Sequence, residues 1–386
     1  MSGICLLAPV RNCSADKRRK SLQNLAVLAL LLLIAASGPA WAKSPRLSKM
    51  STTVADGLGN LSGVAVDSKG NIYVTDNLKN EHTVKQIPAS CAGSANCIKT
   101  LGGGFGMLGG VAVDSEGNVY VADRGNKAVK QIPASCISGA NNASCIKTLG
   151  GGFMGRSDLV GVRANLRPFL MIEFEGISDV AVDARGNVYV ADNYRDKHSV
   201  KMVPSSCING ANDASCVKTL GGGFTLPVGV AVDGSGNVYV IDVNFAEAAD
   251  IAKKYGNGSD KWTGAVKEIP ASCINGANNE GCVKALGGGF GCPHSIAVDS
   301  SGNVYIIDIN SDFNDTGMGF ASWMGTMKEI PSACINGANN ESCVNKLGSS
   351  LDIGFLALDG GGSIYFTNVR KVKKMSIAAV TGQLPE

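Results

Sequence analysis

One sequence unit recurs along this chain and constrains its fold more than any other feature. The unit begins Gly-Val-Ala-Val-Asp-x-x-Gly-Asn-Val-Tyr-Val-Ala-Asp, continues Val-Lys-x-Ile-Pro-Ala-Ser-Cys and ends Cys-Val-Lys-Thr-Leu-Gly-Gly-Gly-Phe. Its first part appears six times, with leading aspartates Asp67, Asp114, Asp183, Asp233, Asp299 and Asp359. Self-similarity at this spacing indicates a repeat architecture, in which each unit buries its apolar face against the next.

Each unit predicts four short strands, here called a to d. In the first unit, strands a and b are 64–66 and 72–74, and a Gly-Asn turn joins them. Strand c covers Thr83–Ile87 and ends at a proline, which cannot donate to a sheet ladder. Strand d covers Ile98–Leu101 and precedes a glycine run. Four strands per 40–50 residues describe a propeller blade, so we expect an all-β, six-bladed β-propeller.

The two chain ends predict how the ring closes. Residues 53–63 align without a gap to residues 100–110, so the chain opens on a strand d that has no blade of its own. The last unit supplies strands a and b and a strand c over Val372–Ile377, and then stops. We expect the N-terminal strand to complete the last blade, because this pairing removes two exposed sheet edges.

The core pattern resembles the NHL repeat family over about residues 53–376. The resemblance implies a six-bladed propeller, but it says little about function. NHL propellers serve as binding platforms and sensor domains, and relatives include enzymes.

The N-terminal segment has the pattern of an export signal. A basic stretch, Lys17–Lys20, precedes the apolar run Leu25–Ala36, which is shorter than the roughly 20 residues of a membrane-spanning helix. Ala40-Trp41-Ala42 then fits a signal-peptidase site. We predict a signal peptide over residues 1–42, a single propeller domain over residues 43–386, and a secreted or periplasmic protein; an uncleaved membrane anchor is the alternative.

The charge balance argues against nucleic acid as a partner. The chain has 35 basic and 32 acidic residues, of which residues 1–42 hold five and one. The mature net charge is therefore about −1, and no basic stripe is present to bind phosphates. We expect a monomer that contacts membranes only through its signal segment.

The cysteines support export. Ten of them form five pairs at a fixed place in the repeat, which is typical of disulfides in an oxidising compartment. Zinc is the competing interpretation, but no histidine or second pair lies beside any pair to complete four ligands. The pairs are Cys91/Cys97, Cys136/Cys145, Cys207/Cys216, Cys273/Cys282 and Cys334/Cys343.

Three insertions interrupt the repeat, at residues 153–178, 243–264 and 310–325. Strand direction places the b–c and d–a connections together on one face, here called the loop face, and the a–b turns and cysteine hairpins on the other, the hairpin face. All three insertions belong to the loop face, where long irregular loops are typical binding elements. The alternative is that they cap the tunnel or contact a neighbour. Candidate binding residues are Arg163, Arg167, Phe169, Phe174, Phe245, Tyr255, Trp262, Phe313, Phe320 and Trp323, together with His294.

The entry to the fifth unit departs from the glycine-rich pattern and reads Cys292-Pro293-His294-Ser295. We expect His294 at the axial mouth of the loop face. Pro-His-Ser-Ile-Ala resembles an entry motif of the peptidyl-hydroxyglycine amidating lyases, in which such a histidine binds zinc. That resemblance implies histidines from several blades, and the other equivalent positions here have none. A Cys292/His294 nucleophile or metal pair stays as an alternative to a turn histidine beside an unpaired thiol.

An acidic residue ends strand b in five units, at Asp76, Asp123, Asp192, Asp242 and Asp308. Five equivalent carboxylates could form a cation ring. The family pattern favours capping of the b–c turn instead.

Two functions from different classes follow from these observations. The favoured one is a non-catalytic, exported scaffold that binds a peptide, protein or glycan on the loop face. The alternative is a metal-dependent lactonase- or lyase-like enzyme with an axial pocket near His294. For that enzyme only Asp179, His294 and Asp352 approach the axis by pattern, which is an incomplete ligand set. No cofactor is predicted, and a divalent cation at the axial mouth belongs to the alternative.

Overall fold

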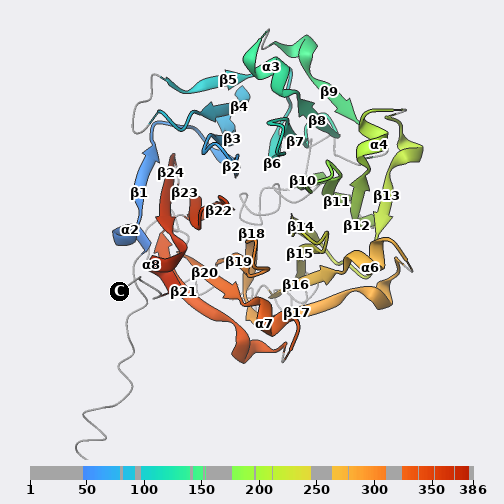
Figure 1. Ribbon diagram of the computed structural model, residues 1–386, viewed down its shortest axis with the longest axis vertical. Coiled ribbons are helices and arrows are strands. Elements are labelled where there is room, and N and C mark those ends of the chain that lie inside the picture. The colour runs from blue at the N-terminus through green and yellow to red at the C-terminus, as the bar shows by residue number, and fades with distance from the viewer. Residues whose placement is uncertain are drawn as a thin grey trace, which may run out of the picture. The chain divides into compact units, whose positions relative to one another are not determined.

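Six four-stranded antiparallel sheets form the fold; in five of them the strands follow chain order from the inside outward, and in the sixth the N-terminal strand β1 is the outermost. The computed structural model describes residues 47–78, 81–91, 97–139, 142–150, 153, 176–194, 197–210, 212–244, 263–276, 278–309, 324–337, 339–351, 353–368 and 370–381. The innermost strands neighbour one another around a ring, as Figure 1 shows. The predicted six-bladed propeller is therefore confirmed, and the predicted signal peptide lies outside the described residues.

The blades are numbered here in chain order. The inner strands a are β2 (Leu61–Val66), β6 (Leu108–Val113), β10 (Gly176–Val182), β14 (Pro227–Val232), β18 (Cys292–Val298) and β22 (Ile353–Leu358). The strands b are β3 (Ile72–Leu78), β7 (Val119–Asp123), β11 (Val188–Tyr194), β15 (Val238–Asn244), β19 (Val304–Ile309) and β23 (Ser363–Asn368). The strands c are β4 (Glu81–Ile87), β8 (Ala128–Ile132), β12 (Lys197–Val203), β16 (Thr263–Ile269), β20 (Met324–Ile330) and β24 (Lys371–Ser376). The outer strands d are β5 (Lys99–Leu101), β9 (Lys147–Leu149), β13 (Lys218–Leu220), β17 (Lys284–Phe290), β21 (Asn345–Leu351) and, in blade 6, β1 (Thr52–Ala55).

The ring closes as predicted. Strand β1 pairs antiparallel with β24, and Thr53 lies opposite Lys373 while Ala55 lies opposite Val372. The chain ends add two short helices beside this joint, α2 (Leu47–Met50) and α8 (Ile377–Thr381), which contact each other and β21. Strand c of the last blade therefore stops at Ser376, one residue earlier than predicted, and Ile377 begins α8.

The hydrophobic core lies between blades. Six clusters of buried side chains are present, and each joins residues of two neighbouring blades. The cluster between blades 4 and 5, for example, joins Ile241 and Val266 to Ile296 and Ile306. Because each blade is hydrophobic on both sides, each sheet needs a neighbour on either side, and closing the ring gives the two end blades theirs.

All five predicted cysteine pairs are disulfide-bonded, with Cα–Cα distances of 5.7–5.9 Å. In blades 2 to 5 the hairpin between strands c and d is more ordered than a turn. A short α-helix follows the proline and carries the first cysteine, and a 3-10 helix carries the second. The α-helices are α3 (Ala134–Ser138), α4 (Ser205–Ile208), α6 (Ala271–Ile274) and α7 (Ser332–Ile335). The 3-10 helices are η2 (Ala143–Cys145), η3 (Ala214–Cys216), η4 (Glu280–Cys282) and η5 (Glu341–Cys343).

Blade 1 has a shorter hairpin, and its second cysteine corrects one predicted boundary. Cys91 and Cys97 are six residues apart instead of nine, yet their Cα atoms lie 5.8 Å from each other, as in the other blades. Cys91 is buried, whereas Cys97 is half-buried and its sulfur lies 3.7 Å from the Cys91 carbonyl oxygen. The backbone at Cys97 is 3-10 helical, so the prediction that strand d starts at Ile98, directly after this cysteine, is wrong by one residue: β5 begins at Lys99. The chain needs that one residue to leave the 3-10 turn and become extended.

The Asp-x-x-Gly-Asn-x-Tyr part of the repeat ties the a–b turn to the hairpin. In blade 4 the Asp233 carboxylate accepts the backbone amides of Ser235 and Asn237, the Asn237 side-chain amide and the Tyr239 hydroxyl, over 2.8–3.1 Å. The Asn237 Oδ1 atom accepts the Ala271 amide, at 2.9 Å, where helix α6 begins. Blades 1, 2, 3 and 5 repeat this link from Asn71, Asn118, Asn187 and Asn303. Blade 6 has Ser363 at this position, and helix α8 follows its strand c directly.

Replacing this asparagine tests the link. Asn237→Ala removes two side-chain hydrogen bonds, so we expect the free energy of unfolding to fall by about 2–3 kcal/mol in urea denaturation. Asn275→Ala is the matched control, because the exposed Asn275 amide donates only to the Ala271 carbonyl, at 3.0 Å. We expect it to cost less than about 0.5 kcal/mol. Equal losses in the two variants would contradict the assignment.

Candidate functional site

The predicted binding residues belong to the three insertions, most of which lie outside the described residues. Phe153 is an exception within the first insertion: it is buried against blade 3. The ends of the insertions are also described and continue the strands, as Gly176 does in β10 and Val243 in β15. The predicted residues outside the described range are Arg163, Arg167, Phe169, Phe174, Phe245, Tyr255, Trp262, Phe313, Phe320 and Trp323.

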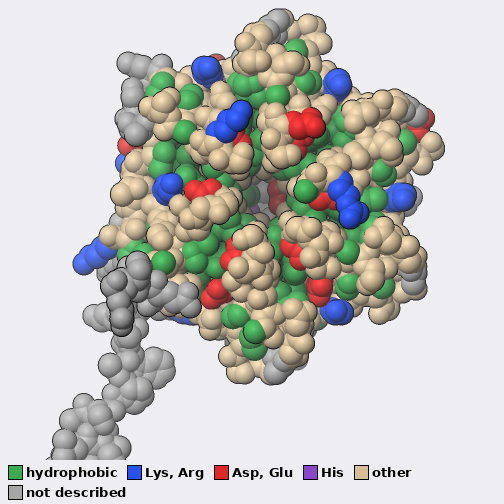
Figure 2. All heavy atoms as spheres, viewed as in Figure 1, with side chains coloured by type: hydrophobic (Ala, Val, Ile, Leu, Met, Phe, Trp, Pro, Cys, Tyr) green, Lys and Arg blue, Asp and Glu red, His purple; other side chains and the backbone are tan. Residues whose placement is uncertain are grey.

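Charge is distributed evenly on the face that Figure 2 shows. Isolated acidic and basic side chains surround the central opening, and no continuous patch of one sign is visible there. This agrees with the nearly balanced composition of residues 43–386.

The five strand-b aspartates are buried, and each is ion-paired with a lysine on strand c that lies diagonally across the ladder, opposite the residue two positions before the aspartate. The Nζ–Oδ2 distances are 2.6–2.7 Å in blades 1, 3, 4 and 5 and 3.5 Å in blade 2. The aspartates are at most 4% exposed, so a lysine at this distance neutralises a charge that burial would otherwise disfavour. The pairs are Asp76–Lys85, Asp123–Lys130, Asp192–Lys201, Asp242–Lys267 and Asp308–Lys328. A cation ring is therefore not needed to balance these carboxylates.

In blades 1, 2, 4 and 5 the same carboxylates hold the d–a connection that enters the blade. Asp76 accepts the amide of Gly59 at 2.8 Å, and Asp242 accepts the amides of Thr225 and Leu226 at 2.7–3.1 Å. Asp123 also caps the b–c turn of blade 2, by accepting the Asn126 amide at 3.2 Å; the b–c connections of blades 1, 3, 4 and 5 lie wholly or partly outside the described residues. The predicted capping role is thus present, but its main target is the d–a loop, which sequence position alone does not identify.

A phenylalanine of the d–a loop covers each lysine in blades 2 to 5. The lysine Nζ lies 5.1–6.0 Å from the ring centre in the pairs Lys130–Phe105, Lys201–Phe153, Lys267–Phe224 and Lys328–Phe290. Cation–π contact and the ion pair therefore act on the same ammonium group. Together they fix the roots of both loop types on the loop face.

Every inner strand carries a β-bulge near its loop-face end, which redirects one side chain at the mouth of the tunnel. In β18 the bulge lies between Pro293 and Ser295, so His294 is the redirected residue. Its ring lies 4.7 Å from that of Phe355 in blade 6, at an interplanar angle of 52°. The structure thus places His294 at the axial mouth, as the sequence predicts.

The surroundings of His294 keep its imidazole neutral. Burial lowers the pKa of His294 to about 4, and the positive charge of Arg124 contributes to the shift. Arg124 belongs to blade 2, where its Nε atom donates to the Ile177 carbonyl at 3.4 Å. A neutral imidazole at pH 7 can bind a ligand through hydrogen bonds or a metal through a lone pair.

Cys292 is the free cysteine of the described residues and is 4% exposed. Burial raises the pKa of its thiol to about 12, and the Asp308 carboxylate adds to the shift. The thiol is therefore protonated at neutral pH, which argues against a nucleophilic Cys292/His294 pair.

Asp179 crosses the junction between blades 3 and 4 at the tunnel wall. Its carboxylate accepts the amides of Val180, at 2.9 Å, and Val230, at 3.0 Å. Burial raises its pKa to about 7 despite these two bonds. Its approach also requires glycine at position 110, where a Cβ atom would lie 1.7 Å from Asp179 Oδ1. Asp352, the third axial residue predicted from the pattern, lies outside the described residues.

Two absences hold for the described part of the chain. No group of three or more His, Cys, Asp or Glu side chains is arranged there to hold a metal ion. None of its helices has the length and apolar character of a membrane-spanning segment.

Comparisons with known proteins identify the repeat. The NHL repeat model matches residues 58–87 and 105–132, which span much of blades 1 and 2. A search of curated proteins found no match.

Solved structures share the fold at low sequence identity. A gluconolactonase from Xanthomonas campestris is 13% identical, with 84% of this chain and 88% of that chain covered and a TM-score of 0.51. Kuenenia stuttgartiensis hydrazine synthase is 12% identical, with 86% and 81% covered and a TM-score of 0.53. A protein of unknown function from Bacteroides thetaiotaomicron is 13% identical, with 84% and 72% covered and a TM-score of 0.51. Identities this low show a shared fold and no shared activity. This chain is therefore a six-bladed β-propeller in which two blades match the NHL repeat model.

Proposed function

We propose that this protein is an exported, non-catalytic propeller that binds a peptide, protein or glycan on its loop face. The observation that carries the proposal is the ion-paired aspartate at the end of strand b, repeated in five blades. The strand-c lysine neutralises this aspartate. In blades 1, 2, 4 and 5 the aspartate also anchors the d–a loop by accepting a hydrogen bond from its backbone. A rigid base that presents long loops is a general design of binding proteins.

The axial mouth supplies groups suited to recognition. The neutral imidazole of His294 can donate and accept hydrogen bonds, and the Phe355 ring beside it offers an apolar face. Arg124 brings a guanidinium group to the same mouth, where its charge acts on His294. This set favours binding over acid–base chemistry, because it combines a neutral imidazole with a permanent cation.

Export is part of the proposal. Five disulfides indicate an oxidising environment. We propose that residues 1–42 supply the export signal and that the mature protein is a secreted or periplasmic monomer.

Tryptophan fluorescence offers a direct test. Once residues 1–42 are removed, the chain retains only Trp262 and Trp323, one in each of two insertions. We therefore expect a true ligand, sought among soluble oligosaccharides and random-sequence peptides, to change the intrinsic emission. Calorimetry should then show binding weakened about tenfold or more by Trp262→Ala/Trp323→Ala.

The control is the double variant Trp262→Phe/Trp323→Phe, which retains aromatic area and should retain most of the affinity. Unchanged binding in the double alanine variant would refute a role for these loops.

A metal-dependent lactonase- or lyase-like activity is the second candidate. It is favoured by one observation: His294 and Asp179 both lie at the tunnel wall, on inner strands of different blades. The similar gluconolactonase shows that this kind of fold can carry such chemistry in another protein. If this function holds, purified mature protein retains one zinc or calcium ion per chain, and His294→Ala loses it. If the binding function holds, elemental analysis finds retained metal in neither protein.

The titration of His294 tests the description of the axial mouth. We expect its imidazole NMR signal to titrate near pH 4, well below the ordinary value of about 6.5. Because the folded-state pKa is lowered, the free energy of unfolding should fall as the pH drops from about 6.5 towards 4. In His294→Gln this part of the fall should disappear. A midpoint near 6.5 in the folded protein would show that the ring is solvated instead.

A further inference from the structure

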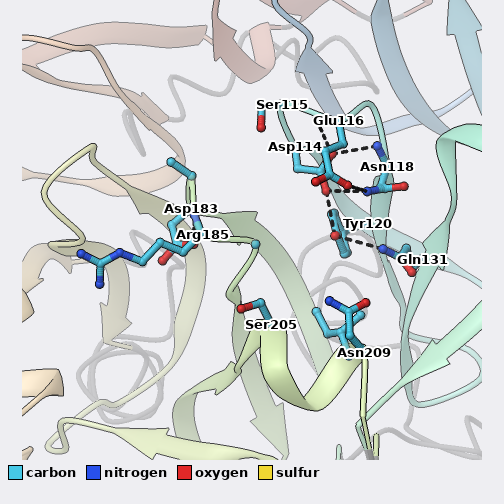
Figure 3. A pocket seen from close by; sticks show the side chains of 13 residues that line it. Asp114, Ser115, Glu116, Asn118, Tyr120, Gln131, Asp183, Arg185, Ser205 and Asn209 are labelled. Atoms are coloured by element: carbon cyan, nitrogen blue, oxygen red, sulfur yellow. Dashed lines mark hydrogen bonds between the residues drawn. The ribbon is translucent and has the colours of Figure 1, made fainter.

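The furrows between blades on the hairpin face differ greatly in size. Between blades 2 and 3 a cavity of about 130 Å³ lies between the two a–b turns (Figure 3). Glu116 and Arg185 project from these turns, and Ser205 and Asn209 of the blade 3 hairpin complete its wall. The blade 3 hairpin thus closes one side of this small cavity, while the Arg185 side chain extends away from Glu116.

The equivalent furrow between blades 5 and 6 is a cavity of about 980 Å³. Ser301 occupies the turn position of Glu116, and Gly361 occupies that of Arg185. Helix α8 follows strand c of blade 6, at the position where the other blades have a disulfide-bonded hairpin. Loss of one hairpin and of two long side chains has opened this junction.

The missing hairpin also leaves an outer strand without its usual partner. In blade 4 the side-chain amide of Asn278 binds strand d of blade 3: Nδ2 donates to the Thr219 carbonyl at 2.8 Å, and Oδ1 accepts the Gly221 amide at 2.9 Å. Asn212 and Asn339 make the same two bonds to the strands d of blades 2 and 4. By position in the repeat, the equivalent residues in blade 5 are Lys346 and Gly348 on β21, although here Gly348 lies opposite Met327 in the ladder with β20, next to a register shift. No asparagine of the described residues reaches them.

The wall of this cavity is rich in acceptors. The Tyr305 hydroxyl has one hydrogen, yet lies 3.2 Å from both Asp299 Oδ2 and Glu329 Oε1. In blade 2 the residue equivalent to Glu329 is Gln131, which donates to the tyrosine hydroxyl at 3.0 Å. Glu329 is 7% exposed, and its other oxygen accepts the Asn345 side-chain amide at 3.0 Å.

Opposing positive charge is limited. Asp359, the third carboxylate of the wall, has Lys374 at 3.7 Å. Lys346 is the one basic residue among those that line the cavity. Three carboxylates against these two lysines leave one negative charge without a basic partner, which favours a cationic ligand.

We propose that the junction of blades 5 and 6 binds an extended peptide segment of a partner protein that carries a lysine or arginine side chain. A main-chain or side-chain amide of the segment takes the place of the missing asparagine on β21, as in β-strand addition. The basic side chain reaches Glu329 and supplies the donor that this cluster lacks. The cavity volume lies within the range of ligand sites. The site is on the hairpin face, so it is independent of the loop-face function proposed above.

The test is a selection with mature, oxidised protein from a random-sequence hexapeptide library, followed by affinity measurements on the selected peptides. We expect the peptides to be enriched in lysine and arginine. Glu329→Gln, which installs the residue of blades 1 and 2, should weaken their binding about tenfold, because it removes a charged hydrogen bond. Gly361→Arg, which installs the blade 3 residue, should weaken it at least as much by filling and charging the cavity.

The matched control is Ser235→Arg, which adds the same charge at the same turn position of blade 4. Ser235 is exposed, and the nearest neighbour of a Cβ atom at Gly361 is the Asp359 Oδ1 atom at an ordinary 3.4 Å. Both arginine variants should therefore fold and melt within about 2 °C of the parent protein. The control should retain full affinity for the selected peptides.

Three outcomes would overturn the proposal. The first is a library that yields no binder or binders without basic residues. The second is binding that survives Gly361→Arg but is lost in Trp262→Ala/Trp323→Ala, which would place the peptide on the loop face and leave the loop-face proposal intact. The third is self-association in sedimentation that Gly361→Arg abolishes while no peptide binds, which would assign the cavity to a second copy of this chain.

Discussion

The half-buried hydrogen-bond cluster of the Asp-x-x-Gly-Asn-x-Tyr turn is the interaction on which the rest of the structure depends. One carboxylate satisfies two backbone amides, a side-chain amide and a tyrosine hydroxyl, as Asp67 does in blade 1. The asparagine of the turn then accepts a backbone amide at the end of strand c, where the disulfide hairpin begins, and so links the turn to the hairpin. Each blade thus fixes its own hairpin, and in blades 3 to 5 that hairpin binds the outer strand of the previous blade. A local turn signal is in this way converted into contact between blades.

Closing a ring from one chain breaks this regularity at one place. The last blade must take its outer strand from the N-terminus, so no segment can run from its strand c to its strand d. The sixth hairpin is therefore absent for a topological reason, and blade 6 also lacks the asparagine that would have ordered it. The apolar part of the gap is filled by Leu47 and Val380 of the two terminal helices. Its polar part stays open as the cavity between blades 5 and 6.

The sequence was sufficient for features that depend on local pattern. Six blades, the pairing of β1 with β24 and five disulfides all follow from repeated motifs and their spacing, and His294 reaches the predicted axial mouth. Features that depend on a neighbouring blade could not be read in the same way. The main target of Asp76 and Asp242 is the d–a loop, because the loop folds back over the end of strand b, and no spacing rule encodes that approach. The cavity between blades 5 and 6 was missed for the same reason, although the three consecutive glycines Gly360–Gly362 depart from the other a–b turns and could have indicated it.

The sequence departs from the repeat differently on the two faces of the propeller. On the loop face the chain adds residues, and the strand-b ion pairs hold the described loop roots so that long insertions leave a fixed base. On the hairpin face the chain removes residues, and the space appears only where a hairpin is missing and turn side chains are short. An added loop can change its sequence without disturbing the blade beneath it, because its base is already neutral and hydrogen-bonded. The residues that line the cavity cannot change as freely, because two of them, Tyr305 and Asp299, are hydrogen-bonded to each other within blade 5. Binding specificity on the loop face can therefore vary independently of stability, whereas a ligand at the blade 5–6 junction must fit groups that the fold already requires.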